Sequence, residues 1–272
     1  MNNSAPLKCP AFPITRQCPF DPPKEFSEFR DAEPAAEVQM WNGSIVKAYT
    51  AYDDVKKILA DKRFSSDPQT PGFPSLSPAR DAVLNAEPAF IRMDPPEHDR
   101  HRRMLTREFM IKKMADLRPM IQRIFDDLLD DLMAKGNSAE FNRDLFLPMT
   151  STVIAELLDV PHEDHAFFQE QSRLRILVDV DPYVPTEASK KILDYMEKLV
   201  VERMNDPEGR DDIISRLILD QVRPGNLTPR ELAVMADLLL MAGHETTANQ
   251  MALGVYSLLT NPDQLEMLKN DP

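Results

Sequence analysis

The feature that most constrains this chain is one long helical pattern near its C-terminal end. It begins at Thr228, where Pro229 and Glu231 complete a capping box, and it continues to Asn261-Pro262, where a new helix is capped. Its 32 residues would extend roughly 48 Å at the rise of an α-helix. A helix of that length is long enough to cross a whole domain.

Residues 242–247, AGHETT, interrupt this pattern near its middle. Glycine costs a helix about 1 kcal/mol relative to alanine, and threonine gains little there, so the interruption has no local reason to exist. One interpretation is a zinc site, because His244-Glu245 resembles the start of H-E-x-x-H. Ala248 stands where that motif needs its second histidine, so the zinc interpretation fails.

Three interpretations of the interruption remain open. Gly243 could allow close helix packing, with Thr246 and Thr247 bonding back to carbonyls one turn earlier. Glu245 and Thr246 could instead relay protons into a buried site, where a loosened helix leaves free carbonyls and a water-sized gap. His244 could be a catalytic base, although a histidine beside a carboxylate is more often a hydrogen-bonded structural group.

A second cluster, MDPPEHDRHRRML, also carries chemistry. We expect Asp94 to cap a helix with Pro95 at its first position, so that His98 and Arg102, four residues apart, project from one face. Such a face suits a carboxylate or phosphate, because arginine offers a two-pronged donor and histidine adds a third hydrogen bond. The alternative is a solvated basic helix.

The rest of the sequence predicts a mainly α-helical fold with one hairpin. Asn42-Gly43 lies between two β-like runs and favours a type I′ turn, and Thr50 and Asp53 form a capping box for a short helix. Residues 61–93 hold five prolines and predict a long irregular loop. The apolar positions from Ile121 to Leu132 predict an amphipathic helix that stops at Gly136, and further helices are expected at 149–158, 162–177, 187–205 and 211–221.

Charge and composition exclude several classes of function. The net charge of −13 argues against a general nucleic-acid or anionic-membrane binder. No segment approaches the uncharged run of about 18 residues that spans a bilayer, and the N-terminus has no signal-peptide core. We therefore expect a soluble, cytoplasmic protein. Cys9 and Cys18 both lie in a Pro-rich leader and predict neither a disulfide framework nor a metal cluster.

Together, DPPEHDRHRRML and AGHETT resemble the soluble cytochrome P-450 family of haem-thiolate oxygenases. The likeness runs from about residue 20 to Pro272 and includes GFPSLSP, DDIISRLI and NPDQLEML. Bacterial-type members and the related fungal nitric-oxide-reducing branch both look similar. The resemblance implies the cytochrome P-450-like helical fold, with residues 1–23 as a leader and 24–272 as an incomplete catalytic domain.

The resemblance also implies a cofactor, haem b, and its contacts. His98 and Arg102 match residues that bind a haem propionate. Ala242, Gly243 and Thr246 match the segment across the distal haem face, where the glycine kinks the helix to make room for dioxygen. These roles follow from the likeness of the motifs.

In the same way, Glu245 and Thr246 match the catalytic acid and threonine that organise proton delivery during dioxygen activation. The implied reaction inserts one oxygen atom into a small organic substrate. Electrons would come from a separate redox protein, because no G-x-G-x-x-G motif is present. The segment from His98 to Arg118 contains seven Lys or Arg residues and three acidic residues, and this excess of positive charge suits an acidic ferredoxin.

Two family signatures are not found in the sequence: an E-x-x-R helix after the long helix, and the Gly-rich loop whose cysteine ligates the iron. Glu170–Arg173, EQSR, fits E-x-x-R but precedes the long helix, so we interpret it as coincidence. We expect the axial cysteine beyond Pro272 and the present chain alone to be inactive. Two alternatives are a nitric-oxide-reducing cytochrome P-450, where Glu245 would typically be non-acidic, and a non-catalytic helical remnant.

Overall fold

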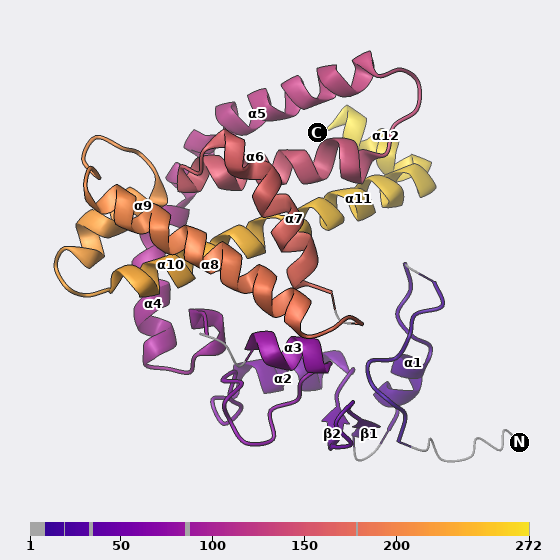
Figure 1. The fold of residues 1–272 in the computed structure, drawn as a ribbon. Helices are drawn as coiled ribbons and strands as arrows, with labels where there is room; N and C mark the ends of the chain where they lie inside the picture. Colours follow the sequence, from indigo (N-terminus) through magenta and orange to yellow (C-terminus); the bar gives the residue numbers. More distant parts are fainter. Residues whose placement is uncertain (1–8, 19, 33–34, 85–87, 178, 272) are drawn as a thin grey trace, which may run out of the picture. The chain divides into compact units, whose positions relative to one another are not determined.

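A computed structural model describes residues 9–18, 20–32, 35–84, 88–177 and 179–271. The chain divides into two compact units. The first holds the described part of 1–99 together with 174–188, and the second holds 100–173 together with 189–272. Helices dominate, as the sequence predicts, and Figure 1 labels them in chain order.

The first unit contains the predicted hairpin. Strands β1 (Ala36–Gln39) and β2 (Ile45–Ala48) pair antiparallel, with Gln39 opposite Ile45. The predicted type I′ turn is wrong, because of the two central residues only Gly43 has a positive φ, of 83°. The Asn42 side chain instead accepts hydrogen bonds from the Ser44 N–H and hydroxyl, at 3.0 and 2.7 Å, within a longer loop.

The described part of the leader is attached to this hairpin. The Phe12 N–H donates to the Gln39 carbonyl at 2.8 Å, and the Gln39 N–H donates to the Pro10 carbonyl at 2.9 Å. Phe12 and Ile14 pack against a small core made of Phe29, Val38 and Met40. The boundary between leader and domain at residues 23 and 24 stays a prediction.

Two short helices follow α1 (Glu25–Arg30) and the hairpin: α2 (Tyr52–Ala60) and α3 (Pro78–Leu84). The predicted capping box at Thr50 is wrong. Helix α2 takes Ala51 as its N-cap, and the Thr50 hydroxyl donates to the Phe26 carbonyl at 3.0 Å. A tertiary contact therefore uses the side chain that the sequence assigned to the cap.

The predicted irregular loop at 61–93 contains α3 and a 3₁₀ turn, η1 (Phe90–Arg92), so it is only partly irregular. Its serines also change the start of the next helix. The Asp94 carboxylate accepts hydrogen bonds from the Ser65 hydroxyl at 2.5 Å and the Ser66 N–H at 3.0 Å. Helix α4 begins at Glu97, two residues later than predicted, because Asp94 is held by the loop.

The second unit is a helical assembly. Most of its helices lie where the sequence predicts them, with ends shifted by a few residues, but α5 (Ile111–Ala134) begins ten residues before the first predicted apolar position at Ile121. The other helices are α4 (Glu97–Thr106) and α8 (Tyr183–Met204), which start in the first unit, α7 (His165–Arg175), which ends in it, and α6 (Leu147–Leu158) and α9 (Ile213–Leu217). Short 3₁₀ or π segments complete it: η2 (Arg107–Phe109), η3 (Asn142–Phe146), η4 (His162–Asp164) and η5 (Ile218–Val222).

The long C-terminal pattern forms two helices rather than one. Helix α10 (Pro229–Gly243) begins with the predicted capping box, in which Thr228 accepts the Glu231 N–H. Helix α11 (Glu245–Thr260) follows after a break at His244, and α12 (Pro262–Asn270) ends the described chain. Both α10 and α11 contact α6, and Figure 1 shows the two following one another through the second unit.

Candidate functional site

The break between α10 and α11 lies within the AGHETT segment. His244 has φ −87° and ψ −91°, so it ends one helix and begins the next. Its side chain is buried, and its Nε2 has no hydrogen-bond partner among the described residues. Burial lowers the pKa of His244, which favours a neutral imidazole.

Gly243 packs directly against helix α6. A Cβ atom placed on Gly243 would stand 3.2 Å from both Cγ1 and Cδ1 of Ile154, a buried residue of α6. Contacts this short require the neighbour to move, so the glycine allows the two helices to approach. This supports the packing interpretation of Gly243. Ile154 fills the side of the glycine where a side chain would stand, and the helix break itself falls at His244.

Thr246 bonds back to the preceding turn. Its hydroxyl donates to the Ala242 carbonyl at 2.5 Å, whereas Thr247 makes no such bond among the described residues. Ala242 and Thr246 are four residues apart and both exposed, so they lie near one another on one face beside the break. The back-bonding predicted for Thr246 is confirmed. Ala242 and Thr246 therefore form a small exposed surface beside the break, and this surface carries the Thr246 hydroxyl.

Glu245 is partly buried beside this face. Burial raises the pKa of its carboxyl group, and the positive charge of Arg173 on α7 opposes that rise. Arg173 in turn forms an ion pair with Glu170 at 2.8 Å. Glu170 and Arg173 of the EQSR segment therefore form an ion pair, and the positive charge of Arg173 also acts on Glu245. Sequence reasoning missed this role, since an i,i+3 pair shows in the sequence but its nearness to α11 does not.

Helix α4 carries the second cluster. His98 and Arg102 both lie on α4, as predicted, four residues apart. The His98 Nδ1 lies 2.9 Å from Asp99 Oδ1, and the His98 ring lies 6.1 Å from that of Phe90. The Arg102 side chain is exposed and makes no hydrogen bond or ion pair with any residue that the structure describes. Its guanidinium donors are thus available.

The predicted basic segment between His98 and Arg118 is partly neutralised. Arg100 binds Glu231 at 3.0 Å, Arg107 binds Asp220 at 3.4 Å, and Lys113 binds the buried Glu108 at 2.8 Å. Four of the seven cations make no side-chain ion pair within the described ranges: Arg102, Arg103, Lys112 and Arg118. The segment is still basic, but its charge is smaller than its composition suggests.

Comparison with known proteins decides the family. Residues 32–271 match the cytochrome P450 family. Cytochrome P450-SU2 from Streptomyces griseolus is 42% identical over 271 residues, which cover 99% of this chain. The chain belongs to the cytochrome P450 family. Pentalenic acid synthase from Streptomyces avermitilis is a further relative, 39% identical over 269 residues, which cover 99% of this chain.

Solved structures agree with the P450 assignment. The mycinamicin VIII C21 methyl hydroxylase MycCI from Micromonospora griseorubida superposes with a TM-score of 0.88 at 34% identity, and the match covers 96% of this chain. The chain spans about two thirds of these relatives, namely 66% of P450-SU2, 65% of pentalenic acid synthase and 66% of MycCI. In the described part of the chain, no helix is long and apolar enough to span a bilayer.

The cofactor of the P450 family is haem b. Two observations fit that group: Arg102 has donors that no described residue uses, and the exposed residues Ala242 and Thr246 beside the break have small side chains. A guanidinium suits a propionate, and a flat ring needs small side chains where a helix approaches it. Within the described ranges, no three His, Cys, Asp or Glu residues are grouped as metal ligands.

Proposed function

We propose that the protein to which this chain belongs is a haem-dependent mono-oxygenase, which inserts one atom of dioxygen into a small organic substrate. One observation carries the proposal. Glu245 and Thr246 are the first two residues of α11, directly after the helix break at His244, and the Thr246 hydroxyl bonds back across that break to the Ala242 carbonyl. The name of the related MycCI hydroxylase is consistent with this reaction.

The proposed haem contacts come from three helices, α4, α10 and α11. Arg102, with His98 one turn earlier on α4, would bind a propionate. Ala242, Gly243 and Thr246 would lie along the ring. When bound, the haem supplies reductive activation of dioxygen, chemistry that no side chain can provide.

Glu245 and Thr246 have complementary roles in this proposal. Burial raises the pKa of Glu245, so its carboxyl keeps a proton to higher pH than an exposed glutamate does. Thr246 directs its hydroxyl proton to the Ala242 carbonyl, which leaves the hydroxyl oxygen free to accept a hydrogen bond. Glu245 would therefore carry the proton, and Thr246 would orient it.

The proposed electron donor is an acidic ferredoxin, and the proposed location is the cytoplasm. The four cations of α4 and α5 that make no ion pair with a described residue would attract such a partner, and this attraction should weaken as ionic strength rises. Salt-independent reduction rates would contradict this assignment.

The nitric-oxide-reducing alternative is less favoured because of Glu245. The resemblance implies that members of that branch typically have a non-acidic residue at the position of Glu245, and their reaction does not cleave dioxygen. Isotope labelling separates the two. A mono-oxygenase transfers one ¹⁸O atom from labelled dioxygen into its product. Rapid reduction of nitric oxide with direct oxidation of nicotinamide would instead establish the alternative.

We also propose that these 272 residues alone do not provide the thiolate ligand. Cys9 and Cys18 both precede the hairpin and every P450 motif of the chain. The chain alone should give no thiolate-type carbon-monoxide difference spectrum and no turnover, whereas the complete enzyme should give both. A normal thiolate spectrum from the chain alone would overturn this statement, and no spectrum from either would favour a helical remnant without catalysis.

A further inference from the structure

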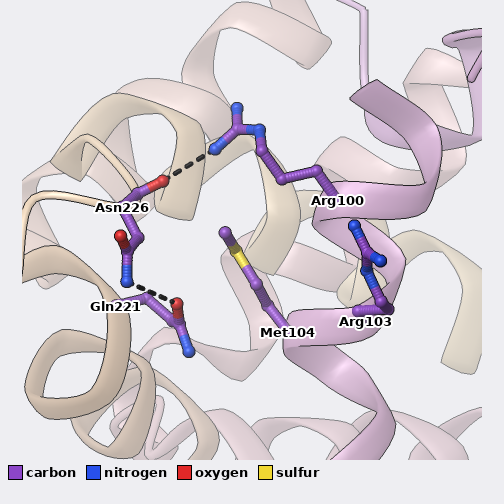
Figure 2. Close-up of a pocket in the computed structure, with 5 residues that line it drawn as sticks. All are labelled: Arg100, Arg103, Met104, Gln221 and Asn226. Atoms are coloured by element: carbon purple, nitrogen blue, oxygen red, sulfur yellow. Dashed lines mark hydrogen bonds between the residues drawn. The ribbon is translucent and has the colours of Figure 1, made fainter. Parts of the chain in front are cut away.

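A pocket of about 350 Å³ lies in the second unit, between α4 on one side and η5 with the turn that joins it to α10 on the other. Five residues line it: Arg100, Arg103, Met104, Gln221 and Asn226. Figure 2 shows Arg100 reaching from α4 to Asn226 above the Met104 side chain, while Gln221 from η5 and Asn226 from the turn face α4. No carboxylate is among the lining residues.

The walls of this pocket are fixed by hydrogen bonds. Arg100 donates to the Asn226 carbonyl at 2.7 Å and to Glu231 Oε1 at 3.0 Å. The Gln221 carbonyl accepts the Asn226 N–H at 2.9 Å, which closes the turn. Both sides of the pocket are therefore held in place before any ligand arrives, and this lowers the entropy cost of binding.

The charge of Arg100 is already balanced. Its partner Glu231 also accepts the Thr228 N–H and hydroxyl, each at 2.8 Å. Burial alone would raise the pKa of Glu231, but the hydrogen bonds from Thr228 and Arg100 lower it to about 2. Both oxygens of the Glu231 carboxylate thus accept hydrogen bonds, and the bond to Oε1 keeps Arg100 in position.

Arg103 differs from Arg100. Its guanidinium makes no hydrogen bond or ion pair with any residue in the described ranges. The side-chain oxygen of Gln221 accepts a long hydrogen bond from the Asn226 amide at 3.4 Å. The side-chain nitrogen of Gln221 donates to no residue in the described ranges, so it is an available donor. The pocket therefore combines one unbalanced cation, one amide donor and the apolar Met104 in a chain whose net charge is −13.

We propose that this pocket binds a small organic oxyanion, a phosphate or carboxylate attached to a compact apolar group. Arg103 would grip the oxyanion with two parallel N–H donors, and Gln221 would add a third hydrogen bond. Met104 would pack against the apolar group. The pocket faces a different side of α4 from Arg102, since adjacent helical residues point about 100° apart, so this site does not depend on haem.

Calorimetric titration tests the proposal directly on the 272-residue chain. The probes are phenyl phosphate and inorganic phosphate, at low ionic strength, with chloride as competitor. Phenyl phosphate should bind more tightly than inorganic phosphate. Arg103→Gln should weaken both by about tenfold or more, because it removes the charge-assisted pair. Met104→Ala should weaken phenyl phosphate alone.

Arg107→Gln is the matched control, because Arg107 is an exposed arginine one turn further on that does not line the pocket and is paired with Asp220. It should leave both affinities nearly unchanged. Equal weakening by Arg103→Gln and Arg107→Gln would show diffuse charge attraction and overturn the proposal. Displacement by equimolar chloride, or the absence of any binding heat, would also overturn it. None of these three outcomes bears on the mono-oxygenase proposal, because the titration uses no haem and no turnover.

Discussion

The α10–α11 break and helix α4 place their functional residues in opposite environments. At the break, His244 is buried, Glu245 is partly buried and Gly243 lies against Ile154. On α4, Arg102 is exposed and without a partner among the described residues. The environment of the residues at the break is therefore set by packing between helices. The arrangement of the residues on α4 is set by their spacing along one helix.

This difference separates two kinds of effect. A buried carboxyl has a shifted pKa and suits proton transfer, so changes at the break should alter chemistry and stability. An exposed arginine retains its charge and suits the binding of anions, so changes on α4 should alter affinity and salt dependence. A change at the break that altered only anion affinity, or a change on α4 that altered only proton transfer, would contradict this division.

The largest effect is expected for Glu245→Gln in the haem-loaded enzyme. Removing the ionisable carrier should lower turnover by about 10²- to 10⁴-fold, the range typical of general acid–base groups. Substrate binding should change little. The measurement is steady-state turnover alongside a substrate titration. Glu266→Gln, on α12 and paired with Lys269 at 2.7 Å, serves as control. Wild-type turnover in Glu245→Gln would remove the carboxyl from the mechanism.

Arg102→Ala should next weaken haem retention by about ten- to a hundredfold, because a propionate loses a charge-assisted partner. His98→Ala should act in the same direction but less strongly. Haem transfer to apomyoglobin measures the loss rate. Arg107→Ala, also exposed but paired with Asp220, should leave that rate unchanged. If neither Arg102→Ala nor His98→Ala alters it, α4 is a solvated basic helix.

Gly243→Val should destabilise the chain by about 1–3 kcal/mol through overpacking against Ile154. Ile154→Val removes Cδ1, one of the two atoms nearest the new side chain, and should recover part of that loss in the double variant. Gly254→Ala on α11 is the control, since a Cβ there meets nothing within 4 Å. It should stabilise by about 0.5–1 kcal/mol. Urea denaturation measures all four, and strictly additive effects at 243 and 154 would contradict the contact.

The smallest effect concerns the pH dependence of stability at His244. Its folded pKa lies below the unfolded value of about 6.5, so the unfolded chain binds more protons below that pH. Stability should therefore be complete above about pH 6.5 and fall as the pH drops towards the folded pKa. His244→Gln should flatten this fall. His165, whose pKa burial also lowers, remains as the background in both proteins. Identical pH profiles would show that His244 does not titrate on unfolding.

Local signals predicted much of this architecture. The capping box at Thr228 and the helix that carries His98 and Arg102 four residues apart depend on residues within one turn of each other, and the structure confirms them. The caps expected at Thr50 and Asp94 fail because Phe26 and Ser65 bind those side chains. Both partners lie more than 20 residues away in the sequence, where helix signals carry no information.

The break shows the same limit more clearly. The sequence predicted one helix with an unexplained glycine at 243, whereas the structure has two helices with Ile154 behind that glycine. It also brings the charge of Arg173 to bear on Glu245. Neither partner could be identified from the spacing of AGHETT, because both come from other helices. The haem-site roles of Ala242, Gly243 and Thr246 stay predictions.

The most direct test of the proton-delivery account is the ratio of hydroxylated product to reductant consumed in Thr246→Ala. Removing the hydroxyl that donates to Ala242 should leave substrate binding and reductant use nearly intact. Thr247→Ala, which removes a neighbouring hydroxyl with no hydrogen bond in the described structure, is the matched control. The account predicts that Thr246→Ala lowers the ratio sharply and releases peroxide, while Thr247→Ala retains the wild-type ratio. An unchanged ratio in Thr246→Ala would contradict it.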